Sequence, residues 1–173
     1  EADLLGLGSA KSWCLLACAG DHSFLRNKLV FDFAELAGIP YSPDCTWIDL
    51  YLNGEYAGLY LLCEPIEVHP ERVAIGEENS FLVTKDFPDR LGTYQEDYFT
   101  TADNASIGIL SSDFPIYTLA GLWQSVENAV LSEDGIDPTT GKSWDELIDP
   151  RSWAKKFLLE ESFGNIDAPV LSQ

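Results

Sequence analysis

Near the end of the chain, the segment GNIDAPVLSQ (residues 164–173) places three polar side chains directly after a predicted helix. The helix is expected to stop at Gly164, and the chain then presents Asn165, Asp167 and Ser172 with a proline among them. An aspartate held in a loop behind a well-packed helix suits a general base or a metal ligand. An Asx turn or the cap of another element would use the same residues without chemistry. Composition alone leaves both interpretations open.

A second polar group stands at the start of a predicted helix over residues 22–37, where Asp21 precedes the pair Arg26-Asn27. The other positions of this helix are mainly apolar, so we expect Arg26 and Asn27 to be partly buried, and buried polar groups need partners. Arg26 would then either form a structural ion pair or face an anion.

The third candidate is Glu64, at the end of a predicted strand and on the same face as Tyr60 and Leu62. A carboxylate at such a position is costly unless a cation pairs with it or the sheet edge meets solvent. We therefore predict that Arg26 and Glu64 are each at least half buried and lie close together or share a polar partner.

Composition and motifs narrow the function classes. With 29 acidic and 10 basic residues the net charge is −19, which repels nucleic acid and anionic membranes. No apolar run approaches the length of a transmembrane helix. The chain has no P-loop, dinucleotide-binding glycine pattern, HExxH or GxSxG motif, and His22 and His69 lack ligand spacing.

Four cysteines, at positions 14, 18, 45 and 63, show neither a CxxC pair nor the spacing of a zinc site. Cys14 and Cys18 fall in a segment, residues 12–19, that we predict to be a buried strand with both on one face. We expect buried free thiols, and disulfides remain the alternative.

Residues 46–64 have the pattern of a β-hairpin, because apolar residues alternate on both sides of Asn53-Gly54. A two-residue turn there would be type I′. The predicted cross-strand pairs are Tyr51 with Tyr56, Leu50 with Ala57, Asp49 with Gly58, Ile48 with Leu59, and Trp47 with Tyr60.

The remaining elements complete an α+β architecture. The helix over residues 22–37 has Asp21 as a plausible N-cap and Gly38 as its end, and its apolar residues on several faces predict burial on several sides. A strand at 80–87 and irregular short strands within 88–114 follow. A segment that becomes helical near Leu119 and an exposed acidic loop at 132–149 come next. The last helix begins at Asp149-Pro150, and its buried side should consist of Trp153, Phe157, Leu158 and Phe163.

Residues 11–68, KSWCLLACAGDHSFLRNKLVFDFAELAGIPYSPDCTWIDLYLNGEYAGLYLLCEPIEV, resemble the signature of the spore coat protein H (CotH) kinase family. That family shows an Asp two residues before Ser or Thr, an Arg-Asn pair, and a long Asn-Gly-x-Tyr-x-Gly-x-Tyr hairpin that ends in Glu. Residues 157–173, FLLEESFGNIDAPVLSQ, resemble a later block with Asn-x-Asp. Together the matches cover about two thirds of the chain. The matching residues of the first block are Asp21, Ser23, Arg26, Asn27, Asn53, Gly54, Tyr56, Gly58, Tyr60 and Glu64.

The resemblance implies a minimal protein-kinase-like fold in a single domain, with a sheet-rich region at 1–115 around helix 22–37 and a mainly helical region at 116–173. It implies transfer of the γ-phosphoryl group of ATP, with Mg²⁺ or Mn²⁺, to Ser or Thr of secreted, cell-surface or spore-coat proteins of bacteria. Asp167 would be the catalytic aspartate, and Arg26 and Glu64 would support the nucleotide site. At the strand that contains Val83-Thr84-Lys85-Asp86, relatives often carry a different sequence. Lys85 is a candidate for the cation that would bind the phosphate groups.

The family's metal-binding aspartate is expected beyond residue 173 and its glycine- and lysine-rich strands before residue 1. We therefore expect an incomplete domain that has no metal ligand within residues 1–173 and is inactive alone. The alternative is a non-catalytic structural module of a spore coat or of an extracellular, cellulosome-like assembly. A third class, a carbohydrate-associated binding module, rests on aromatic content and acidity alone.

Overall fold

The computed structural model describes residues 1–76, 78–86, 91 and 97–165. The chain divides into two compact units, Glu1–Ala74 and Ile75–Gln173, which are described in turn. Small antiparallel sheets and four helices make up the described residues, so the fold class is α+β, as predicted. No helix in the described part of the chain is long and apolar enough to cross a membrane.

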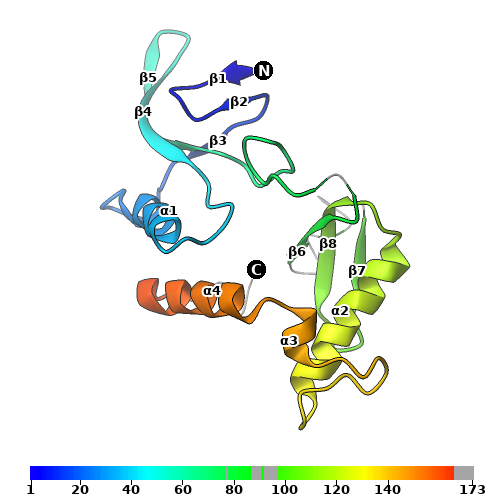
Figure 1. The fold of residues 1–173 in the computed structure, drawn as a ribbon. Coiled ribbons are helices and arrows are strands. Elements are labelled where there is room, and N and C mark those ends of the chain that lie inside the picture. The colour runs from blue at the N-terminus through cyan, green and yellow to red at the C-terminus, as the bar shows by residue number, and fades with distance from the viewer. Residues whose placement is uncertain (77, 87–90, 92–96, 166–173) are drawn as a thin grey trace. The chain divides into compact units, whose positions relative to one another are not determined.

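The first unit is built on a three-stranded antiparallel sheet with the order β3-β5-β4 (Figure 1). Its strands are β3 (Cys14–Leu16), β4 (Cys45–Leu52) and β5 (Glu55–Cys63), and β5 lies in the centre. Two-residue strands β1 (Ala2–Asp3) and β2 (Ser9–Ala10) pair with each other. The strand predicted over residues 12–19 is present but shorter, and Cys18 already has a positive φ of 50°. Its predicted burial is wrong, because Leu15 is exposed and Cys14 and Leu16 are only partly buried.

The β4–β5 hairpin turns at Asn53-Gly54, and both residues have positive φ, as a type I′ turn requires. Tyr51 pairs with Tyr56, as predicted, and their rings lie 5.3 Å apart. Beyond this pair the predicted register is wrong by one residue, because a β-bulge leaves Ala57 without a partner and pairs Leu50 with Gly58. The observed pairs are Asp49 with Leu59, Ile48 with Tyr60 and Trp47 with Leu61.

Helix α1 (Arg26–Leu36) begins four residues later than predicted. Its end at Gly38 is confirmed: the Gly38 amide donates to Glu35 and the Ile39 amide donates to Ala34, which is the Schellman arrangement. The predicted burial on several sides is wrong, because Ala34 is the one fully buried residue of α1, and one stripe of the helix is exposed. That stripe consists of Leu25, just before the helix, and Leu29, Phe33 and Leu36.

The second unit contains a sheet of order β6-β8-β7, formed by β6 (Phe81–Lys85), β8 (Ser106–Ser112) and β7 (Tyr98–Thr100). Helix α2 (Ile116–Leu131) packs against this sheet (Figure 1). The core between them consists of Phe99, Ile107, Ile109 and Leu119. The strand at 81–85 is confirmed, and the helix begins earlier than expected, directly after Pro115.

Helices α3 (Trp144–Leu147) and α4 (Pro150–Phe163) follow. The signals at both ends of α4 are confirmed, since the Asp149 carboxylate accepts a hydrogen bond from the Arg151 amide and Gly164 has a left-handed φ of 59°. The predicted buried side of α4 is wrong: Leu159 is buried. The side chains expected there are exposed, namely Trp153, Phe157, Leu158 and Phe163.

Candidate functional site at the base of the hairpin

Glu64 directly follows β5, and its side chain is only 8 % exposed. Its Oε2 atom accepts a hydrogen bond of 2.9 Å from the Asp44 amide, and its own amide donates to the Asp44 carbonyl at 3.1 Å. The predicted burial of Glu64 is thus confirmed. A buried carboxylate at this position ties the beginning of β4 to the end of β5.

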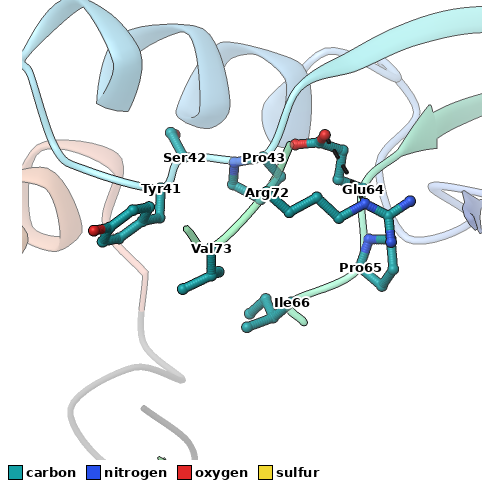
Figure 2. Close-up of a pocket in the computed structure, with 8 residues that line it drawn as sticks. All are labelled: Tyr41, Ser42, Pro43, Glu64, Pro65, Ile66, Arg72 and Val73. Atoms are coloured by element: carbon teal, nitrogen blue, oxygen red, sulfur yellow. Dashed lines mark ion pairs between the residues drawn. The ribbon is translucent and has the colours of Figure 1, made fainter. Parts of the chain in front are cut away.

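The cation that accompanies Glu64 is Arg72, whose side chain is 2 % exposed. Arg72 Nε lies 4.0 Å from Glu64 Oε1, and the guanidinium group also donates to Glu67 and to the Ser12 carbonyl. The guanidinium carbon lies 5.0 Å from the centre of the Trp13 ring, in cation–π contact. Figure 2 shows the extended Arg72 side chain lying alongside Glu64. Arg72 thereby joins the end of β5 to the segment before β3.

The loop after β5 presents Arg72 by folding back on itself. A parallel bridge joins Val68 to Val73, the Val73 amide donates to Glu67, and the Arg72 amide donates to the His69 carbonyl. The sequence analysis did not identify Arg72. A signal was available, because Arg72 is the only Lys or Arg between Lys28 and Lys85, whereas the preceding strand end carries the two carboxylates Glu64 and Glu67.

The electrostatics of Glu64 reflect two opposing effects. Burial raises the pKa of its carboxyl group above the ordinary value, while the Asp44 amide and the Arg72 charge act in the opposite direction. Arg72 Nε is buried and has no hydrogen-bond partner. The ion pair is therefore looser than a direct bidentate pair, in which two parallel hydrogen bonds would form.

A small hollow of about 20 Å³ adjoins this pair (Figure 2). It has room for about one water molecule and is far smaller than a typical ligand pocket of roughly 300–1,000 Å³. A nucleotide does not fit into it. Its walls come from the segment before β4 and the loop after β5, and comprise Tyr41, Ser42, Pro43, Glu64, Pro65, Ile66, Arg72 and Val73.

Arg26 does not take part in the Glu64 cluster, and the prediction that both are buried and share a partner is wrong for Arg26. Its side chain is 81 % exposed, and Asn27 is exposed as well. Arg26 Nε lies 3.7 Å from Asp21 Oδ1. The first turn of α1 faces solvent here, so that these polar side chains need no buried partner.

Asp21 organises the turn before α1 even though it is not the N-cap residue. Its carboxylate accepts hydrogen bonds from the Ser23 hydroxyl, the Ser23 amide and the Arg26 amide. The Ser23 hydroxyl, followed by the Arg26 amide, lowers the pKa of Asp21 to about 2. The Asp-x-Ser spacing thus serves a local turn, and it satisfies the amide of the first helical residue.

The hairpin residues named in the sequence analysis have local roles. Asn53 and Gly54 form the turn, and the Tyr56 hydroxyl donates to Asp49 at 3.2 Å. Gly58 has a φ of 122° beside the bulge, and a side chain there would lie in ordinary contact with Tyr60.

The other candidates lie in the second unit. Lys85 ends β6 opposite Ile107 and is partly buried. Asn165 is exposed, and its amide donates to the Glu160 carbonyl at the end of α4. Asp167 and Ser172 lie outside the described residues.

A buried carboxylate that the sequence analysis missed is Asp137, in the loop predicted to be exposed. It is fully buried and accepts hydrogen bonds from the Ser125 and Thr140 hydroxyls, the Asn128 amide group and the Thr139 backbone. These donors, led by Ser125 and Thr140, hold the pKa of Asp137 well below its usual range. The set of hydrogen bonds fastens the loop to α2, which indicates a structural role.

No group of three or more His, Cys, Asp or Glu side chains within the described residues has the geometry of a metal site. What this part of the chain arranges is a buried Glu–Arg pair at the base of a hairpin, with an exposed arginine at the start of α1.

Comparison with known proteins supports the family suggested by the sequence. No curated protein and no solved structure matches the chain. The family model described as "CotH kinase protein" matches residues 1–133, which include the hairpin, Glu64 and Arg72. Because this match spans most of the 173 residues, the chain belongs to the CotH kinase family.

Proposed function

We propose that the protein is a kinase that transfers the γ-phosphoryl group of ATP, with Mg²⁺ or Mn²⁺, to Ser or Thr hydroxyls of a protein substrate. The observation that carries this proposal is the family match over residues 1–133. By the same reasoning, the substrate is a secreted, cell-surface or spore-coat protein, the source is bacterial, and the fold is a minimal kinase-like one.

In this proposal Asp167 accepts the proton of the substrate hydroxyl, as the positioned aspartate of a kinase does. Lys85 and the exposed Arg26 are the candidate cations for phosphate oxygens. Glu64 acts indirectly: it is held by Asp44 and Arg72, so it positions the end of the hairpin rather than meeting an anion itself. Asn165 and Ser172 flank Asp167 as supporting residues.

The hollow beside Glu64 is too small for ATP, and no acidic cluster in the described segments suits a divalent cation. We therefore derive no catalytic step through either group from these residues.

A second candidate function is a non-catalytic structural module of a spore coat or extracellular assembly. The observation that favours it concerns the guanidinium group of Arg72. This group already contacts Glu64, Glu67, the Ser12 carbonyl and the Trp13 ring. Such an arrangement stabilises the unit and leaves little of the guanidinium group for a ligand.

Transfer of labelled γ-phosphate separates the two functions. The protein at its full natural length is incubated with labelled ATP and either Mg²⁺ or Mn²⁺, alone and with an acidic protein rich in Ser and Thr, because residues 1–173 by themselves are expected to be inactive. The kinase proposal predicts metal-dependent labelling of Ser or Thr that falls when Lys85 or Arg26 is replaced by Ala. Absence of labelling, together with no ATP-dependent rise in melting temperature, supports the structural module.

A further inference from the structure

Three of the four cysteines form a row across the sheet of the first unit. Cys63, in the central strand β5, lies opposite Cys14 of β3 on one side and opposite Cys45 of β4 on the other. Directly opposed residues project from the same face of a sheet. The thiols of Cys14, Cys63 and Cys45 therefore share one face, and burial and both neighbouring cysteines contribute to the raised pKa of the Cys63 thiol.

The two pairs that contain Cys63 differ in type. In an antiparallel ladder, residues alternate between hydrogen-bonded and non-hydrogen-bonded pairs. The Glu64 amide donates to the Asp44 carbonyl, so the adjacent pair of Cys63 and Cys45 is the non-hydrogen-bonded type. In that type the Cα atoms are about 4.5 Å apart and the side chains are closest, which lies within the range of disulfides at about 4.4–6.8 Å.

We propose that Cys45 and Cys63 are a thiol oxidation site, which forms a cross-strand disulfide by exchange with a small-molecule disulfide. This inference is independent of the proposed kinase function. All four cysteines are free in the structure, which therefore represents the reduced form.

The reaction balances in two exchange steps. The Cys45 thiolate attacks one sulfur of the small disulfide RSSR, forms a mixed disulfide and releases one RS⁻. Cys63 then loses its proton to water, its thiolate attacks the Cys45 sulfur, and the second RS⁻ leaves. In total the two cysteines lose two electrons and two protons, and RSSR is reduced to two RSH.

The surroundings of Cys45 and Cys63 indicate which thiol reacts with the oxidant first. Cys45 is partly exposed, and the Lys28 ammonium group partly offsets the rise in pKa that burial causes. Cys63 is buried, and burial together with the neighbouring thiols raises its pKa to about 11. Cys45 is therefore the thiol that meets the oxidant, and Cys63 is the thiol that closes the disulfide.

Cys18 is held elsewhere, because its sulfur contacts the Leu16 carbonyl and the Asn27 side chain. The cysteines also do not form a metal site in the described part of the chain. A disulfide between Cys45 and Cys63 would lie next to the Asp44–Glu64 pair in both strands. Oxidation would thus fix the strand ends that position Glu64.

Trypsin separates the possible pairings cleanly, because it cleaves after Lys and Arg. Cys45 and Cys63 fall together in the fragment 29–72, whereas Cys14 and Cys18 fall in the fragment 12–26. The protein is first reduced, then incubated natively with oxidised glutathione, quenched with acid, alkylated in denaturant and digested. The expected product is fragment 29–72 with both cysteines unalkylated and two hydrogens missing, and fragment 12–26 fully alkylated.

Two outcomes overturn the proposal. A cross-link between fragments 12–26 and 29–72 assigns the disulfide to Cys14 or Cys18, and full alkylation of all four cysteines shows that no disulfide forms. As a matched pair of variants, Cys14→Ser should keep the disulfide within 29–72 and Cys45→Ser should abolish it. Oxidation should raise the melting temperature of the native chain by several degrees and should not raise that of Cys45→Ser. If Cys45→Ser does not fold, the tryptic fragments of the native chain still show which cysteines form the disulfide.

Discussion

Arg72 Nε lies 4.0 Å from Glu64 Oε1, and both side chains are almost completely buried. This pair joins three segments, since Glu64 holds the Asp44 amide before β4 and Arg72 holds the Ser12 carbonyl before β3. Buried charges of this kind seldom add net stability compared with apolar residues, but removing one partner leaves the other charge uncompensated. Loss of either partner should therefore destabilise the first unit.

Replacing Arg72 by Ala should lower the free energy of unfolding by about 3–5 kcal/mol, because Glu64 and the Ser12 carbonyl lose their buried partner. Denaturant titration followed by tryptophan fluorescence measures the change. Arg26→Ala is the matched control, since the same substitution at an exposed arginine should change stability by less than about 0.5 kcal/mol. Equal effects of the two substitutions would contradict the role assigned to the pair.

Asp137 should make the second unit sensitive to acid. Its pKa is lowered in the folded state, so its contribution to stability is complete above the unfolded-state value of about 3.9 and is lost as the pH falls toward the folded-state value. Asp137→Asn should lower the melting temperature at neutral pH and flatten its decline below about pH 5. Thermal melting from pH 7 to pH 3 measures both effects.

The control for this experiment is Asp134→Asn, which changes an exposed carboxylate in the same loop. This variant should melt like the native protein across the same pH range. An Asp137→Asn protein with the native pH profile would show that the buried hydrogen bonds of Asp137 do not depend on its charge.

Gly58→Ala should destabilise the hairpin by about 1–3 kcal/mol, because a φ of 122° is strained for any residue with a side chain. Crowding is not the cause, since the added Cβ would lie 3.6 Å from the Tyr60 ring. Gly20→Ala is the control, because its backbone is ordinary and the space around it is open. It should leave the free energy of unfolding unchanged or raise it by up to about 1 kcal/mol. If Gly58→Ala left the free energy of unfolding unchanged, the backbone conformation beside the bulge would not require a glycine.

In the protein at its full natural length, Asp167→Asn should reduce phosphoryl transfer by about 10²–10⁴-fold if Asp167 is the base, because the amide keeps the size of the side chain and loses its ability to accept the proton. Its melting temperature should stay close to the native value. Transfer and melting are measured side by side, with Asp134→Asn as the control. Near-normal transfer would exclude Asp167 as the base, and a large fall in melting temperature would make it structural.

The features that the sequence alone determined are those that depend on neighbours within a few residues. The Asn53-Gly54 turn requires two positive φ angles, which Asn and Gly tolerate, and the Tyr51–Tyr56 pair follows directly from it. Both ends of α4 follow from Asp149, Pro150 and Gly164, because capping is a matter of one helical turn. The family match likewise rests on residues read in order along the chain.

Tertiary structure decided everything that depends on which surfaces meet. Hydrophobic periodicity predicted a buried helix at 22–37 and partly buried Arg26, whereas the sheet covers little of α1 and Arg26 stays in water. The bulge at Ala57 shifted the register, because strand twist and packing beyond the turn are not encoded in the alternation of residues. Arg72 reaches Ser12 across 60 positions of sequence, and Asp137 is buried by donors from α2. Such contacts arise only when folding brings distant donors and charges together in the protein interior. There, a polar or charged group without a partner would cost free energy.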